Sequence, residues 1–452
     1  MNIIDETNNA KKDFIISQIT ERNIRFIRLW FTDVIGSLKS IAIAPAELES
    51  AINNGIAFDG SSVEGLSRIS ESDMLLKPNL DTFQVLPWRG GNNGAARMFA
   101  EIVAPDGSPT NTDPRAVLTN IVNQYKSLGY EIMVHPEIEF YLFKNSENFP
   151  ENLEPIDRGG YYDQLARSKA IDFRKDAITT LEEMDIPVAL SHHEAGAGQN
   201  EIDLHLNNVL QTADNIISFR TVVKQIALES NVVASFMPKP LDDAPGSGMH
   251  THFTLFSNGE NMFYDEQSGF YKLSPLARQF MAGILDHALE ISAVTNQFVN
   301  SYKRLWAGAE APSFVSWGHN NRSSLLRVPL TTNDKLSARV EIRSIDSSAN
   351  PYLAYAAILA AGLDGINRGL ELPAEANNDA NALTEIERKA LGIKPLPQTL
   401  REALNYFQNS EFMAKVLGEK IFDYFISNKT DEWNRYNQAV SKFEIDELIY
   451  KL

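Results

Sequence analysis

The sequence contains no cysteine, and this absence excludes several kinds of site at once. Disulfide bonds, thiolate metal ligands and a cysteine nucleophile are all ruled out. Basic residues are also scarce, because 41 lysines and arginines stand against 59 aspartates and glutamates, for a formal net charge of −18. Such a charge opposes binding to nucleic acid or to an anionic membrane surface, so neither partner is expected.

Long apolar runs and phosphate-binding glycine motifs are missing as well. The longest apolar stretch, residues 352–363, is too short to span a bilayer, and N-P at 350–351 predicts a buried helix that starts there. The first residues, M-N-I-I-D-E-T, are acidic and unlike a signal peptide. Neither G-x-G-x-x-G nor a P-loop lysine motif occurs, so a nucleotide would have to be held in another way. We expect a cytoplasmic protein whose 452 residues form two domains.

Turn-forming residues divide the chain near residue 108. The stretch P-D-G-S-P-T-N-T-D-P (105–114) carries three prolines and a glycine, which predicts a linker. We therefore expect a small α+β unit at residues 1–108 and a larger part at residues 109–452. Hydrophobic patterning predicts strands at 83–88 and 96–103, and helices at 115–128, 170–185, 211–230, 275–299 and over the last fifty residues.

Two carboxylates one residue apart are the most informative feature of the sequence. Glu137 and Glu139 lie in the apolar run H-P-E-I-E-F-Y-L-F (135–143), which predicts a β-strand. Alternate residues of a strand point to the same face, so the two charges would lie side by side. A solvated edge strand would explain such a pair. On a mostly buried strand, the pair would instead need a cation between the two side chains.

More acidic and imidazole pairs follow, and they favour the buried alternative. They are Glu194 with Glu201, His250 with His252, and Glu341 with Arg343. Five carboxylates and a histidine on short strands and loops suit two or three hard divalent cations. Because oxygen ligands predominate and no thiolate is present, Mg²⁺ or Mn²⁺ is expected rather than zinc.

Basic residues, although few, gather in one stretch of forty residues. They are Arg304, Arg322, Arg327, Lys335, Arg339 and Arg343. Apolar residues are interleaved with them, which indicates that several face inward and not into solvent. Arginine recognises carboxylate and phosphate through its planar fork. Beside a Mg²⁺ cluster, these side chains suit phosphoryl transfer from a nucleotide.

The motifs along the chain together resemble one family. They are F-T-D-V-I-G (31–36), F-D-G-S-S-V-E-G (58–65), E-S-D-M (71–74), P-E-I-E-F (136–140), H-H-E…G-Q-N-E (192–201), M-P-K-P (237–240), G-S-G-M-H (246–250), N-S-Y-K-R-L (300–305), E-A-P (310–312), N-R-S (321–323) and S-S-A-N-P-Y-L (347–353). In this order they resemble the type I glutamine synthetases over nearly the whole chain. The spelling of W-G-H-N-N-R-S and P-G-S-G-M-H-T-H is similar to a second branch, common in actinobacteria, which includes γ-glutamylpolyamine synthetases.

The resemblance implies an α+β fold of two domains. These are a small N-terminal β-grasp domain and a larger catalytic domain with a curved antiparallel sheet surrounded by helices. It also implies a homo-oligomer, a dodecamer of two stacked six-membered rings, with each active site formed between neighbouring subunits.

The resemblance further implies a role for each member of the acidic and basic sets. One metal ion would be held by Glu139, Glu194 and Glu201, and a second by Glu137, His250 and Glu341. Glutamate would be bound by Gly246, Arg304 and Arg343, under a flap that carries Glu310. ATP would face His252, Thr254, Arg327, Lys335 and Arg339, with Arg322 near the transferred phosphate. Asp33 would reach the neighbouring subunit's site and, with Tyr161, bind ammonium and deprotonate it. The catalytic residues are then Asp33, Glu310, Arg322 and Arg343.

Several positions depart from the family pattern. Ala189 stands where a nucleotide-contacting glutamate is usual, Pro245 replaces an asparagine before G-S-G-M-H, and Ala309 replaces a tyrosine of the flap. Arg68 matches an arginine linked to glutamine feedback, although a surface salt bridge would explain it equally. These changes leave the expected metal ligands intact and affect the acceptor and nucleotide contacts.

Three functions stay open at the level of the sequence. The leading hypothesis is an ATP-dependent ligase that joins ammonia to the γ-carboxylate of L-glutamate through γ-glutamyl phosphate. The presence of Asp33 and Glu310 favours it. The second joins glutamate to a polyamine or another amine, which the small Ala309 favours. The third is a catalytically silent structural or regulatory relative, and the retained metal ligands argue against it.

Overall fold

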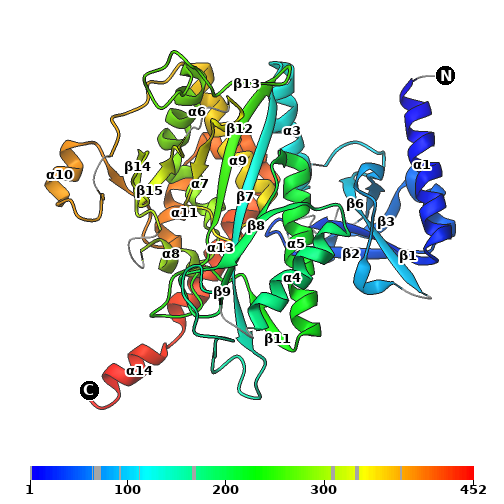
Figure 1. Ribbon diagram of the computed structural model, residues 1–452, viewed down its shortest axis with the longest axis horizontal. Helices are drawn as coiled ribbons and strands as arrows, with labels where there is room; N and C mark the ends of the chain where they lie inside the picture. Colours follow the sequence, from blue (N-terminus) through cyan, green and yellow to red (C-terminus); the bar gives the residue numbers. More distant parts are fainter. Residues whose placement is uncertain are drawn as a thin grey trace.

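The computed structural model describes residues 3–63, 65, 73–90, 93–110, 112–164, 169–306, 311–330, 335–376 and 379–451. Over these residues the chain forms a small sheet with the first helix on one side of the molecule. A larger sheet and most of the helices lie on the other side (Figure 1). The architecture is α+β, as the sequence predicts.

The small sheet has six strands in the described part of the chain, in the order β2-β1-β6-β4-β3, with β5 beside β6. Its centre is the pair β1 and β6, which run parallel, and β2 runs antiparallel to β1. The strands are β1 (Ile24–Thr32), β2 (Leu38–Ile43), β3 (Ile56–Asp59), β4 (Asp73–Pro78), β5 (Gln84–Val85) and β6 (Gly94–Val103).

The large sheet has eleven strands in the described ranges, in the order β17-β14-β15-β16-β12-β7-β9-β8, with β10 and β11 on β7 and β13 on β12. Neighbouring strands are antiparallel except for β14 and β15. The strands are β7 (Glu131–Lys144), β8 (Val188–His193), β9 (Gln199–Leu204), β10 (Asn207–Asn208), β11 (Val232–Ser235), β12 (Met249–Ser257), β13 (Glu260–Asn261), β14 (Phe314–Gly318), β15 (Ser324–Arg327), β16 (Val340–Ile342) and β17 (Lys394–Pro395).

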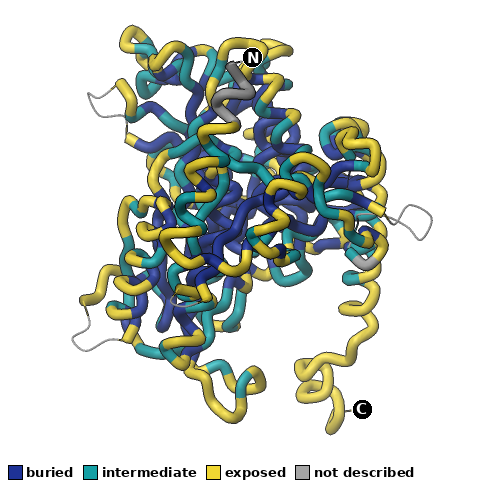
Figure 2. Tube along the Cα trace, turned by 90° about the vertical axis from the view of Figure 1, so that its right-hand side faces the viewer, coloured by how far each residue is buried: buried dark blue, intermediate teal, exposed yellow. Residues whose placement is uncertain are grey.

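Most of the helices belong to the part of the chain that builds the large sheet. Among the described residues, the small-sheet part contains α1 (Ile3–Glu21) and α2 (Leu48–Asn54). The rest of the chain contains α3 (Pro114–Ser127), α4 (Lys169–Glu182), α5 (Val209–Glu229), α6 (Pro275–Asp286), α7 (Ala288–Thr295), α8 (Val299–Leu305), α9 (Pro351–Arg368), α10 (Glu385–Ala390), α11 (Leu400–Gln408), α12 (Glu411–Leu417), α13 (Glu419–Gln438) and α14 (Lys442–Leu448). The helix α14 stands away from the body and is exposed along its length (Figure 2). None of the helices in the described ranges has both the length and the hydrophobicity needed to span a bilayer.

The buried core is centred on α9, the apolar helix that the sequence predicts after N-P. Its cap is Asn350, whose side chain accepts a hydrogen bond from the Tyr352 N–H, and Pro351 occupies the first turn, where no donor is lost. Every residue from Pro351 to Leu363 is buried. The same core includes Trp30 and Phe99 from the small sheet and Leu86, which directly follows β5, so the two parts share packed side chains.

Two of the predicted elements end earlier than the hydrophobic pattern suggests. The strand predicted at 83–88 is restricted to Gln84–Val85, because Pro87 has no N–H to donate and starts a short 3₁₀ turn. The helix predicted at 275–299 breaks at His287 into α6 and α7 and ends at Thr295. The other predicted helices agree with the structure to within a few residues.

Candidate active site

The neighbouring strands β16, β12, β7 and β9 place five of the six expected metal ligands on one face of the large sheet, and the sixth, Glu194, directly follows β8. On β7, Glu137 and Glu139 are two residues apart, as the sequence predicts for a shared face. Across the sheet, His250 of β12 is paired with Glu137, and Glu201 of β9 is paired with Glu139. Because directly paired side chains lie close together, the sheet register brings charges that are far apart in sequence into one group.

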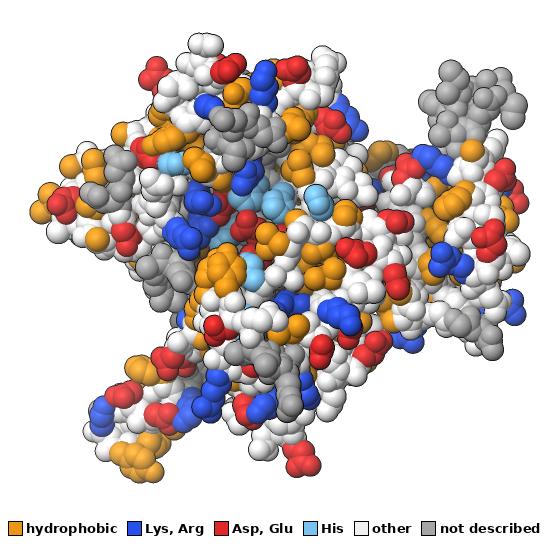
Figure 3. Space-filling model, in the orientation of Figure 1, with side chains coloured by type: hydrophobic (Ala, Val, Ile, Leu, Met, Phe, Trp, Pro, Cys, Tyr) orange, Lys and Arg blue, Asp and Glu red, His pale blue; other side chains and the backbone are white. Residues whose placement is uncertain are grey.

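This face of the sheet forms the floor of a cavity of about 670 Å³. Acidic, basic and histidine side chains gather near the middle of the face seen in Figure 3. The predicted residues that line the cavity are Glu137, Glu139, Tyr161, Glu194, Glu201, Gly246, His250, Arg304, Arg322, Arg327, Glu341 and Arg343.

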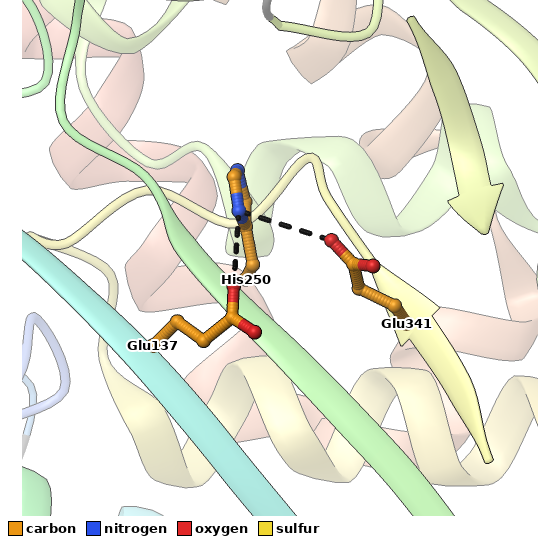
Figure 4. Close-up of side chains that lie close together, drawn as sticks. All are labelled: Glu137, His250 and Glu341. Carbon is orange, nitrogen blue, oxygen red and sulfur yellow. Dashed lines mark ion pairs between the residues drawn. The ribbon is translucent and has the colours of Figure 1, made fainter. Parts of the chain in front are cut away.

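One group of possible metal ligands comprises Glu137, His250 and Glu341, each of which offers a ligand atom within 4.8 Å of the others (Figure 4). The Nδ1 atom of His250 lies 3.5 Å from Glu137 and 3.8 Å from Glu341. Burial opposes ionisation of Glu341, but the neighbouring His252, Arg343 and His250 lower its pKa to about 2. Burial and the nearby Arg343 lower the pKa of His250, which favours the neutral ring that a metal ion needs.

A second group comprises His192, Glu194 and Glu201, whose ligand atoms also lie within 4.8 Å of one another. The Nε2 atom of His192 lies 3.0 Å from Glu201. Glu139 lies beside this group, where it accepts hydrogen bonds from the Gly248 N–H at 2.7 Å and from Gln199 at 3.3 Å. Burial, with repulsion from Glu201 and Glu194, raises the pKa of Glu139 well above its usual range.

These residues fit divalent cations. Buried carboxylates that lie side by side repel one another, and the cost is several kcal/mol unless a positive charge compensates. Oxygen donors with one imidazole in each group suit Mg²⁺ or Mn²⁺. The structure therefore brings together all six ligands expected from the sequence, and it adds His192 to the second group.

Two glycines shape the wall beside the first group. A methyl group on Gly246 would meet the Pro238 carbonyl at 2.5 Å and the side chain of Arg304 at 2.6 Å. Gly248 is equally close to the Arg304 guanidinium, so only glycine at these positions lets Arg304 lie against the backbone. Arg304 is buried and donates to the carbonyls of Ser344 at 2.8 Å and Arg343 at 3.0 Å.

Three further arginines border the cavity. Arg343 is buried, contacts one oxygen of Glu341, and donates from Nε to the carbonyl of Arg322 at 2.9 Å. Arg327 binds the other oxygen of Glu341 at 2.6 Å. Arg322 is exposed. Cationic forks on this side of the cavity face the acidic groups and suit the binding of carboxylate or phosphate between them.

The residues expected to face ATP are only partly gathered. His252 bonds Glu137 at 2.7 Å and accepts from the Arg339 Nε–H at 3.3 Å, so these two lie together. Lys335 is exposed at the start of a short 3₁₀ turn. Thr254 is buried and donates to Asn261 at 2.9 Å, away from the cavity lining.

Tyr161 and Asp33, expected to serve ammonium, lie in different places. Tyr161 lines the cavity with its ring 5.4 Å from that of His192. Asp33 is buried in the turn after β1, where it accepts from the Ser37 N–H at 2.7 Å and lies 3.1 Å from the Lys39 ammonium. It does not line the cavity of its own chain.

Five further residues that the sequence singles out are not among the side chains that define the two acidic groups. Glu310, Ala309 and Arg68 lie outside the described residues. Ala189 is exposed on β8, and the carbonyl of Pro245 accepts a hydrogen bond from Tyr141 at 2.7 Å.

Sequence reasoning passed over several residues that the structure places at the site. Asp203 lines the cavity and is buried, and burial together with repulsion from Glu201 and Glu137 raises its pKa to about 10. His135 stacks on His252 with ring centroids 5.3 Å apart. The signal was present for both, because His135 alternates with Glu137 and Asp203 alternates with Glu201, in the same pattern as the glutamate pair.

Comparison with known proteins identifies the family. Residues 23–105 match the family model "Glutamine synthetase, beta-Grasp domain", and residues 111–448 match "Glutamine synthetase, catalytic domain". Glutamine synthetase from Mycolicibacterium smegmatis is 51% identical over 97% of this chain and 98% of its own length. The Clostridium saccharobutylicum glutamine synthetase is 44% identical over 97% of this chain and 99% of its own length.

A solved structure described as "GmaS/ADP complex-Conformation 1" is similar in fold. It has a TM-score of 0.86 and 28% sequence identity, and the match covers 96% of this chain and 99% of the other. The matched domains confirm the β-grasp and catalytic folds expected from the sequence. On both the sequence and the structure, the chain belongs to the glutamine synthetase family.

Proposed function

We propose that this protein is a glutamate–ammonia ligase, which uses ATP to join ammonia to the γ-carboxylate of L-glutamate and gives glutamine, ADP and phosphate. The observation that carries the proposal is the arrangement of the cavity, where two acidic groups lie beside Arg304, Arg327 and Arg343. A carboxylate cannot react with an amine until its oxygen becomes a good leaving group. Phosphorylation by ATP to γ-glutamyl phosphate achieves this, and it requires the neutralisation of negative charge on the γ-carboxylate of glutamate and on the phosphates of ATP.

The two acidic groups would hold divalent cations, Mg²⁺ or Mn²⁺. We assign Glu139, Glu194 and Glu201 to one ion, and Glu137, His250 and Glu341 to the other. Bound metal ions supply positive charge that screens the phosphates of ATP. The proximity of His192 to Glu194 and Glu201 supports its inclusion as a further ligand of the ion that we assign to Glu139, Glu194 and Glu201.

The chain's own basic side chains would orient the two anionic substrates. Arg343 and Arg304, with the backbone at Gly246, would bind glutamate, and the buried position of both arginines supports a fixed geometry. On the other side, His252, Arg327, Lys335 and Arg339 would face ATP, whereas the buried hydroxyl of Thr254 is held by Asn261. Arg322 would contact the transferred phosphate, where its exposed guanidinium is free to approach a substrate.

The amine would bind near Tyr161, and Asp33 of a neighbouring subunit would act as the general base that converts ammonium to ammonia. The position of Asp33 outside its own cavity supports this sharing. The assembly would be a homo-oligomer, a dodecamer of two six-membered rings. Glu310 would close over the acyl phosphate and keep water out. We place the domain boundary at residue 108, between β6 and α3.

Phosphate release in the presence of glutamate and ATP tests the proposal directly. Ammonium, putrescine, spermine and ethylamine are compared as acceptors, with the Glu139→Gln variant as the inactive control. The expected result is release with ammonium, with glutamine as the product. Release only with a polyamine would replace ammonia by a larger acceptor, and release with none of the four would indicate a silent relative.

A further inference from the structure

Asp203 is a buried carboxylate that lines the cavity and has no role in the proposed reaction. It lies on β9, and its backbone is paired with that of Glu137 on β7. Two residues earlier on the same strand, Glu201 is paired with Glu139. The four carboxylates therefore form a two-by-two array on one face of the sheet, since alternate residues of a strand share a face.

The other three members of this array have positive or hydrogen-bonding partners. His252 lies 2.7 Å from Glu137, His192 lies 3.0 Å from Glu201, and the Gly248 N–H donates to Glu139. The side chain of Asp203 differs, because its partner is the carboxylate of Glu201. Only 3% of Asp203 is exposed, and its Oδ1 atom is buried without a hydrogen-bond partner among the described residues.

A carboxylate buried in this way is costly unless a cation compensates its charge. Protein cations lie on the other sides of the array, around Glu341 and His252, and not beside Asp203 in the described contacts. We propose that Asp203 belongs to the divalent-cation site, as a ligand in addition to His192 and to the six ligands expected from the family. Its oxygen would reach the ion assigned to Glu139, Glu194 and Glu201, directly or through a water that the ion retains. This inference rests on the proposed metal-dependent function but concerns a residue to which that function assigns nothing.

Titration with Mn²⁺ alone, followed by calorimetry on the full-length protein, tests the assignment. The variants are Asp203→Asn, which keeps the shape and removes the charge, and Asp203→Glu, which keeps the charge. A matched control, Asp113→Asn, changes another buried carboxylate that does not line the cavity and that accepts hydrogen bonds from the Ile102 and Arg115 N–H groups. Because neither ATP nor glutamate is present, the result does not depend on which reaction the protein catalyses.

The expected result is that Asp203→Asn lowers the Mn²⁺ affinity about tenfold or more, while Asp203→Glu and the control Asp113→Asn bind Mn²⁺ more tightly than Asp203→Asn. The rise in melting temperature on adding Mn²⁺ should shrink in parallel, because a ligand stabilises the folded state according to its affinity. A role in packing alone would give a different order. If Asp203→Asn binds Mn²⁺ as the parent does, or if Asp203→Glu is the more damaging change, the assignment is wrong.

Discussion

Arg327 binds one oxygen of Glu341 at 2.6 Å, so this carboxylate at the edge of the cavity already has a fixed cationic partner. The other oxygen is contacted by Arg343. Glu341 thus connects the guanidinium group of Arg327, on β15, with that of Arg343, directly after β16. This arrangement links an expected metal ligand to two groups that are expected to bind the substrates. A small change in one of these side chains should therefore affect activity.

Replacing Arg343 by lysine should reduce glutamine formation by about 100-fold, with the oligomer intact. Lysine keeps the charge, but it cannot contact Glu341 and the carbonyl of Arg322 at once, as the guanidinium does. Steady-state rates and gel filtration provide the measurement. Turnover like that of the parent would make Arg343 a structural residue only.

The Glu139→Gln variant should lose metal affinity by at least about tenfold and nearly all turnover. The amide removes the charge that Glu139 contributes beside Glu201 and Glu194, yet it can still meet the Gly248 N–H. Isothermal titration with Mn²⁺ and a glutamine assay check this together. Full activity of the parent in excess EDTA would contradict metal dependence altogether.

Mixing two inactive variants should restore part of the activity if Asp33 serves a neighbouring site. We choose Asp33→Asn, which can still accept from the Ser37 N–H, and Glu341→Gln, which damages the cavity. Subunit exchange then creates interfaces that combine an intact Asp33 with an intact cavity. An affinity tag on one variant shows that hybrids formed. Confirmed hybrids without activity would mean that each chain uses its own Asp33, or none.

His287 should make stability depend on pH. Burial opposes its protonation, but the hydrogen bonds to Glu290 and Asp364 outweigh burial and raise its pKa. A raised pKa in the folded state stabilises the fold fully below about pH 6.5, and this contribution is lost as the pH rises through the folded value. The His287→Gln variant should therefore lose more stability at pH 6 than at pH 9, by about 1 kcal/mol. Chemical unfolding at the two values measures the difference, and an equal loss at both would show that only its stacking on Phe412 matters.

The local pattern of the sequence predicts much of the site because alternation decides which face a side chain occupies. Glu137 with Glu139 and His250 with His252 follow that rule, and both pairs lie on the face of the large sheet that forms the floor of the cavity. Alternation cannot say which strands are neighbours, however. The pairing of β9 with β7 places Asp203 opposite Glu137, and the pairing of β8 with β9 places His192 opposite Glu201. Both relations arise from register between segments that are distant in sequence, so spacing along the chain alone could not place either residue opposite its partner.

The same limit applies to residues that depend on tertiary packing. The apolar pattern continues through His287, but the chain bends there, and the ring stacks on Phe412 of α12 at 3.8 Å. Thr254 alternates with His252 and was expected beside it, yet its hydroxyl donates to Asn261. A neighbouring strand supplied a partner that spacing along the chain could not reveal.

The shared core of the two sheets has a consequence for how the molecule can be divided. Trp30 and Phe99 of the small sheet are buried in the main core, and Arg97 beside them donates to Ser218 of α5. A fragment that ends at residue 108 would expose this aromatic face to water and leave the guanidinium without its hydroxyl partner. The two domains should unfold in a single transition, because each domain completes the interior of the other. For the same reason, replacing one domain by that of a relative should destabilise the protein.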